Sequence, residues 1–225
     1  SLIIMLDSQT LAMMAEGTGA TLYMTLMSTL FGYILGLPMG IILVVTAPKG
    51  LRPNQVVYRI LDVIVNITRS IPFLILMILI MPFTRILVGK TYGTTATIVP
   101  LALAAAPFIA RMVESSLLEV DHGVIEAAQS MGASLWTIIW KVLLAEARTS
   151  LIVGATIALG TILGYSAMAG TIGGGGLGDI AMRYGYYRYQ ADIMIIAVVL
   201  LVLLVQILQV VGMILSKKLD RRNTR

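Results

Sequence analysis

Few residues in this sequence could carry out chemistry on a bound molecule. The chain has no cysteine and a single histidine, His122, which stands next to Asp121. Thiolate zinc sites, disulfides and cysteine nucleophiles are therefore excluded, and a lone histidine without further ligands does not predict a metal site. We expect no catalytic residue and no metal centre, and we place His122 in the turn before a short helix.

A glycine-rich stretch, GYSAMAGTIGGGGLG at 164–178, contains glycines at the spacing of a dinucleotide-binding loop. Such a loop needs a strand before it and a helix after it, whereas these glycines follow a long apolar run. No GxxxxGK[ST] motif occurs, so the chain by itself is not expected to bind a cofactor or to hydrolyse ATP. We interpret 173–190 as a flexible loop.

Asp62 and Arg69 are charged residues within an otherwise apolar stretch, seven positions apart. On a helix they share one face about two turns from each other, with Asn66 between them. Charges at membrane depth usually pair or face water. Two interpretations stay open, a structural charge pair and a direct contact with a transported substrate. Pro72, just beyond, predicts a kink.

The elements that position these residues are membrane spans. Only 12% of the residues are charged, and the mean hydropathy is +0.94. A soluble domain carries about twice that charged fraction. Runs of the ~20 residues needed to cross a bilayer predict an all-α, polytopic integral membrane protein. Its five predicted transmembrane helices cover 21–46, 57–83, 94–113, 149–172 and 191–215.

The basic residues predict the orientation of these spans. Most lysines and arginines fall at one set of span ends, which places the N-terminus outside and the C-terminus in the cytoplasm. The same distribution favours anionic lipid over nucleic acid as the partner of the +5 net charge. Residues 1–19 contain Asp7 and Glu16 and lack a basic region, so we expect an N-terminal surface helix rather than a signal peptide.

The cytoplasmic connection 114–148 is patterned as helix, unlike the other loops. Residues 124–131, VIEAAQSM, favour a helix with small exposed side chains. Gly132 can take the positive φ that ends it, and Ser134 can cap the next helix. Trp136 and its apolar neighbours then recur at helical spacing and suit a membrane–water interface. An amphipathic connector and a docking surface for another protein both fit this pattern.

The string EAAQSMGASLWTIIWKVLLAEA resembles the Glu-Ala-Ala…Gly signature in the permease subunits of ABC importers. Glu126, Ala127, Ala128 and Gly132 fall on that signature, whereas Ala145 stands where the family usually has proline. The strings NITRSIPF, APFIARMVE and GYSAMAGTIGGGGLG are similar to the permeases of methionine-uptake ABC importers. This resemblance covers the chain from about residue 18 to its end.

The resemblance implies a fold and a division of labour. Residues 20–225 would form one permease domain, with a coupling helix between the third and fourth spans. The coupling helix would dock a separate ATPase, which binds the ATP and Mg²⁺, while the permease is not an enzyme. Its docking residues would be Glu126, Ala127, Ala128, Met131 and Gly132.

The resemblance also implies partners, a location and a substrate. The partners would be a second copy of the chain, two ATP-binding-cassette subunits, the bilayer and an extracytoplasmic methionine-binding protein, in a bacterial inner membrane. The substrate would be L-methionine, with D-methionine as a second candidate. The alternatives are an ABC permease for another amino acid or an osmolyte, and an ion-coupled carrier or intramembrane enzyme relying on Asp62 and Arg69.

The fourth span is unusually rich in small residues, which predicts close helix packing. Among them Met168 is bulky, and we expect it to be a gate where two copies of the chain meet. Tyr165 and Ser166 are the candidate polar lining of that path.

Overall fold

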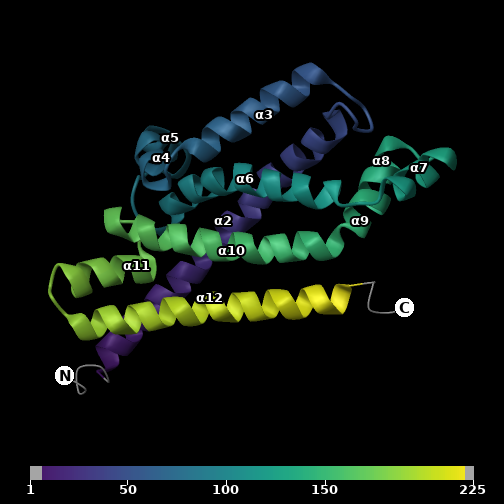
Figure 1. The fold of residues 1–225 in the computed structure, drawn as a ribbon. Helices are drawn as coiled ribbons and strands as arrows, with labels where there is room; N and C mark the ends of the chain where they lie inside the picture. The colour runs from purple at the N-terminus through teal and green to yellow at the C-terminus, as the bar shows by residue number, and fades with distance from the viewer. Residues whose placement is uncertain (1–6, 221–225) are drawn as a thin grey trace.

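The computed structural model describes residues 7–220, and every regular element in this part of the chain is helical. Figure 1 shows α6 and α10 side by side, with α3 beyond α6, α12 beyond α10, and α2 crossing them obliquely. The elements are α2 (Ser8–Thr46), α3 (Gln55–Ser70), α4 (Phe73–Leu79), α5 (Met81–Val88), α6 (Thr94–Leu118), α7 (His122–Ser130), α8 (Leu135–Thr137), η1 (Ile138–Leu143), α9 (Leu144–Glu146), α10 (Arg148–Ala169), η2 (Gly170–Ile172), α11 (Gly176–Ile180), η3 (Ala181–Tyr186) and α12 (Ala191–Leu219).

Within residues 7–220, four helical segments are long and apolar enough to cross a bilayer: α2, α6, the segment 148–186, and α12. The helices α3 and α4 meet at 104°, and they add a fifth span if the two together form one broken span. The break lies at Ile71 and Pro72, because proline supplies no backbone N–H to continue the helix. The predicted kink is therefore confirmed.

The first helix begins earlier than the sequence predicts. We expected a separate surface helix over 1–19, but residues 8–19 are the opening turns of α2, and residues 1–6 lie outside the described part. The helix continues because one face of these turns is covered, where Gly17 packs against Leu177 and Ile180 of α11. The buried residues of that face are Thr10, Met14, Gly17 and Thr21, at helical spacing.

The contact between α2 and α6 depends on three glycines four residues apart, Gly32, Gly36 and Gly40. A methyl group at Gly36 would lie 2.6 Å from the carbonyl oxygen of Ala106, and one at Gly40 would lie 2.7 Å from that of Ala110. Bare backbone on α2 therefore allows the two helix axes to approach closely, as small residues do in membrane proteins.

The glycine-rich stretch after α10 is tightly packed, which corrects the prediction of a flexible loop over 173–190. The amide of Gly174 donates to the carbonyl of Ala169 at 2.9 Å, and the amide of Leu177 donates to the hydroxyl of Thr21 at 2.9 Å. Side chains are absent here because backbone meets backbone, as at Gly178 against the carbonyl of Ala167. The buried members are Gly174, Gly176, Leu177 and Gly178.

Candidate functional site

The α7 segment, residues 121–134, lies at the opposite end of the helices from α11 (Figure 1). Its first turn is capped by Asp121, whose carboxylate accepts a hydrogen bond from the amide of Gly123 at 2.9 Å. His122 is the first residue of α7. His122 therefore lies within the helix and not in the turn before it, which corrects that prediction.

The far end of α7 closes at Gly132, where φ is +78°. The amide of Gly132 donates to the carbonyl of Gln129 at 3.0 Å, and that of Ala133 donates to Ala128 at 3.1 Å. These two bonds satisfy the last carbonyls of the helix and require a left-handed residue between them. Ser134 then caps α8 by accepting from the amide of Thr137 at 3.3 Å, so both sequence predictions for this turn are confirmed.

One face of α7 is packed and the other is bare. Ile125 and Ala128 are half-buried against the apolar cluster that includes Ile138 and Ile139 of η1. The opposite face is open, and Met131 is 87% exposed. Glu126 and Ala127 are also exposed, so four of the five predicted docking residues lie on the accessible surface and Ala128 supports the helix from below. The face of α7 that the sequence predicts for docking is therefore exposed.

The carboxylate of Glu126 is available to another molecule. It lies 3.2 Å from Nε2 of His122 one turn earlier, and both side chains are largely exposed. Such an exposed pair contributes little free energy, of order 0–1 kcal/mol, so a basic group on a partner can displace it. Beside α7 lies an open cleft of about 660 Å³ whose lining includes Lys49, Leu51, Leu118, Ile125 and Gln129.

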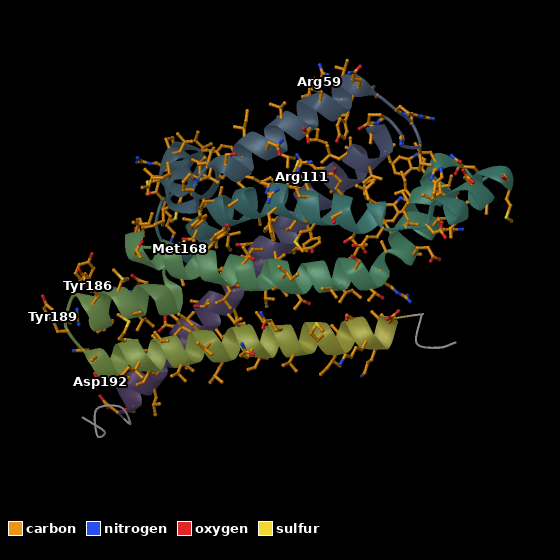
Figure 2. All side chains as sticks on the ribbon, viewed as in Figure 1. Arg59, Arg111, Met168, Tyr186, Tyr189 and Asp192 are labelled. Atoms are coloured by element: carbon orange, nitrogen blue, oxygen red, sulfur yellow. The ribbon has the colours of Figure 1, made fainter. Side chains whose placement is uncertain are left out.

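The three residues predicted to form a path have different surroundings. Met168 is 47% exposed at the end of α10 away from α7 (Figure 2). Tyr165 is partly buried and stacks on Phe73 at 5.0 Å between ring centroids. Ser166 is buried, and its hydroxyl donates to the carbonyl of Leu163 at 2.6 Å. Ser166 therefore does not line an open surface here, which corrects that prediction.

The charge pair predicted between Asp62 and Arg69 does not form. Asp62 instead pairs with Arg111 of α6 at 2.5 Å, and Arg111 also binds Asn66 at 2.7 Å and Glu114 at 2.8 Å. The reason is geometric, because seven residues of helix separate two side chains by about 10 Å along the axis. A neighbouring helix places its arginine closer. Within the described residues the side chain of Arg69 has no hydrogen bond or ion pair.

Residues 32–225 match the family described as binding-protein-dependent transport system inner membrane component. This covers well over half of the sequence. The chain belongs to this family. Similarity to individual proteins is high as well: it is 51% identical over 210 residues to the probable D-methionine transport system permease protein MetI of Vibrio cholerae, covering 93% of each chain. It is 51% identical over 158 residues to the D-methionine transport system permease protein MetI of Escherichia coli K12, covering 70% of this chain and 73% of that one.

Solved structures share the fold of this inner membrane component. A structure of inward-facing conformations of the MetNI methionine ABC transporter superimposes with a TM-score of 0.94 at 47% identity, covering 96% of this chain and all of that one. An amino acid ABC transporter with histidines gives a TM-score of 0.78 at 18% identity, covering 93% and 95% of the two chains, which shows the fold alone. The recognition of an ABC importer permease from its motifs is thereby confirmed.

The network around Arg111 is the part of this inner membrane component that sequence reasoning missed. Its signal was present, since Arg111 and Glu114 are three residues apart in an apolar helix and so share a face. A guanidinium inside a predicted span requires an acidic partner on another span. Asp62 is the acidic residue of the second predicted span. The sequence favours the pairing of Asp62 with Arg69 because both lie on one helix.

We predict that the Asp121→Ala substitution loosens α7. The loss of an acidic N-cap costs about 1 kcal/mol, which corresponds to a roughly fivefold larger population of the opened helix. Hydrogen exchange of the amides of residues 123–130 measures this opening. Asp121→Asn keeps an accepting oxygen and is the control, and equal exchange rates in the two variants would show that the cap does not stabilise the helix.

Proposed function

We propose that this chain is the permease subunit of an ATP-driven importer of methionine. It would cross the membrane five times, through α2, the α3–α4 pair, α6, α10 and α12, with its N-terminus outside and its C-terminus in the cytoplasm. Support comes from the inner-membrane family and from relatives named for D-methionine transport. A fold that coincides with a methionine ABC transporter supports it further.

The observation that carries the proposal is the α7 segment. It is capped at both ends, held from below by Ile125 and Ala128, and bare on its outer face. An ATP-hydrolysing subunit would seat this face in a groove, contact the small Ala127 at close range and pair a basic group with Glu126. The permease would bind no nucleotide itself, because ATP and Mg²⁺ belong to that partner.

The complete transporter would contain two copies of the chain, two ATPase subunits and a methionine-binding protein at the outer face. ATP binding would draw the two α7 segments together and rock the helices from inward-open to outward-open. The binding protein would then release its substrate between the two permeases. The permease in this scheme is an element with two conformations, and ATP sets which one is populated.

Reconstitution tests the proposal directly. Liposomes that contain the permease with its ATPase, with ATP inside and the binding protein outside, should accumulate labelled methionine. Unlabelled D-methionine, other amino acids and osmolytes, added in excess, establish the substrate. Uptake driven by an ion gradient without any ATPase would overturn the assignment in favour of a carrier.

We predict that the Met168→Ala substitution raises leak. Met168 is the bulky, exposed side chain at the end of α10, and its removal would widen the path where two copies meet. Passive efflux of methionine from liposomes without ATP measures the leak. Ile195→Ala changes a comparably exposed apolar side chain on α12 and should leave the efflux unchanged. Equal efflux from Met168→Ala and the unsubstituted permease would dismiss Met168 as a gate.

A further inference from the structure

The second half of α12 is held against the rest of the protein at few points. Among residues 205–219 only Gly212 and Ser216 are buried. This half lies alongside the first turns of α10 (Figure 1). A first side-chain carbon at Gly212 would lie 2.8 Å from Cβ of Thr156, so bare backbone of α12 meets α10 there. The position of the end of α12 therefore depends on its contact with α10.

Arg148, the first residue of α10, makes a second contact between these two helices. Its Nη2 donates a hydrogen bond to the carbonyl oxygen of Leu219, the last residue of α12, at 2.9 Å. The last carbonyls of a helix have no partner within the helix, and a cation placed there also interacts favourably with the helix dipole. Arg148 therefore caps α12 from a neighbouring helix.

The two contacts lie on one face of each helix. Thr156 follows Arg148 by eight residues, and Leu219 follows Gly212 by seven, which is about two turns in both cases. At ~1.5 Å per residue the contacts are about 10–12 Å apart along the helix axes. A single contact would let one helix swing about the other, whereas two contacts at this separation hold the helices in one relative orientation.

Arg148 is also where the α7 segment is joined to α10. Glu146 ends α9, Ala147 has a φ of −83° and a ψ of 2°, and α10 begins at Arg148. Ala147 is buried in the same apolar cluster as Ile139 and Leu143 of η1, so this junction is packed. A displacement of α7 therefore reaches Arg148 through packed helical turns rather than through a loose loop.

The guanidinium of Arg148 has few other partners. It lines an open cleft of about 430 Å³ to which Glu119, Asp121 and Glu146 contribute carboxylates, yet none of these three forms an ion pair with it. Its Nε is buried and has no hydrogen-bond partner among residues 7–220. The contact between Arg148 and the end of α12 therefore depends on the hydrogen bond to Leu219, which one substitution can remove.

We propose that Arg148 is a positioning residue that makes α12 move together with α10 when the α7 segment is displaced. Held at Leu219 and at Gly212, α12 would follow the first turns of α10 as one body. Without Arg148, α10 would tilt while the end of α12 stayed behind, and displacement of α7 would no longer move the whole helix bundle. This role rests on the proposed function, because the ATPase would supply the displacement.

The first test is the coupling ratio of the complete transporter in liposomes. With Arg148→Gln, ATP hydrolysis should continue while methionine taken up per ATP falls about tenfold, the effect of losing one charge-assisted hydrogen bond. Arg148→Lys keeps the cation and should recover part of the uptake. Arg59→Gln is the matched control, since Arg59 is an exposed arginine on α3 outside this cleft (Figure 2). An unchanged ratio in Arg148→Gln, or an equal loss in Arg59→Gln, would overturn the proposal.

The second test replaces the lost hydrogen bond with a covalent link two turns away. The chain contains no cysteine, so Thr156→Cys with Gly212→Cys introduces a single pair of thiols. Their Cβ atoms start 2.8 Å apart, and a small adjustment gives the ~3.8 Å of a disulfide. Oxidation should restore uptake per ATP in Arg148→Gln, and a reductant should abolish the restoration. A merely local loss of stability at Arg148 would not be rescued in this way.

The same disulfide has a control in the chain that retains Arg148. Uptake there should be the same in the oxidised and reduced forms, because α10 and α12 already move together. Uptake blocked by the disulfide in this chain would show that the two helices move relative to each other. That result, or a disulfide that forms in Arg148→Gln without restoring uptake, would overturn the proposal.

Hydrogen exchange tests the contact itself without cysteine substitutions. In Arg148→Gln the amides of residues 215–219 should exchange about two- to fivefold faster, the range expected for a cation at the last turn of a helix. The amides of residues 123–130 in α7 should exchange at their usual rate. Unchanged exchange at 215–219 would show that Arg148 does not hold α12.

The two levels of the proposal fail differently. If the unsubstituted complex hydrolyses ATP and moves no methionine, the proposed function is wrong, whatever Arg148 does. If that complex imports methionine, and Arg148→Gln imports it at the same ATP cost, only the role of Arg148 is wrong.

Discussion

Replacing Gly132 with tryptophan is expected to abolish ATP-driven uptake while the permease stays folded in the membrane. Gly132 has a φ of +78°, and a side chain in this left-handed conformation costs about 1–2 kcal/mol. Beyond its immediate neighbours no atom lies within 4 Å of the position of a first side-chain carbon at Gly132, so a side chain there starts in open space. It would instead occupy the space into which we propose that the ATPase docks. Methionine uptake, together with co-purification of the ATPase, measures the effect.

Gly89 supplies the matched control for this substitution. It ends α5 with a φ of +88° and likewise has no atom within 4 Å. Gly89→Trp therefore imposes the same backbone strain and the same bulk at a site away from α7, and uptake should continue. Glu126→Lys tests the docking face without strain by reversing its charge. Normal uptake by both Gly132→Trp and Glu126→Lys would mean that α7 is a connector and not a docking surface.

Gly36→Leu is expected to prevent α2 from packing on α6. The first carbon of any side chain at Gly36 would lie 2.6 Å from the carbonyl oxygen of Ala106 and 2.9 Å from Ile109. Backbone cannot yield as a flexible side chain can, so we expect destabilisation at or above the ~3 kcal/mol upper range for overpacked cores. Thermal unfolding of the purified permease in detergent and its yield in the membrane measure this loss.

Gly19→Leu tests whether the position or the residue type matters. Gly19 lies in the same helix, is exposed, and has no atom within 4 Å of its missing side chain. Leucine also favours a helix more than glycine does, so this variant should be as stable as the unsubstituted chain or slightly more so. Similar unfolding temperatures for the Gly36 and Gly19 variants would contradict the close approach of α2 and α6.

The sequence alone predicted the local features that local chemistry dictates. The break at Pro72, the left-handed turn at Gly132 and the cap at Ser134 each depend on one residue type and its immediate neighbours, and all three are present. The exposed α7 face could also be predicted from the sequence, because small residues next to a helix-ending glycine form a distinctive pattern. These features need no knowledge of which helices are neighbours.

The failures concern contacts that the type of a residue does not indicate. Asp62 pairs across α3 and α6, forty-nine residues apart, and nothing in its own helix indicates that partner. The glycines near Gly178 indicate a flexible loop when only the composition is known. Composition shows that a side chain is absent, but it does not show the neighbouring backbone that fills that space. Ser166 was predicted to line a path because its hydroxyl is polar. The sequence does not show that this hydroxyl donates to the carbonyl of Leu163.

The length of the unbroken α2 makes this protein sensitive to the thickness of its membrane. At ~1.5 Å per residue, its 39 residues extend about 58 Å, nearly twice the ~30 Å hydrocarbon core of a bilayer. Hydrophobic mismatch with thicker or thinner lipids is therefore relieved by tilting this rod. Gly17 holds α11 near one end of it and Gly40 holds α6 near the other, so one tilt displaces both contacts together. In the proposed importer, acyl-chain length is therefore expected to bias the balance between conformations without any change in nucleotide or solute.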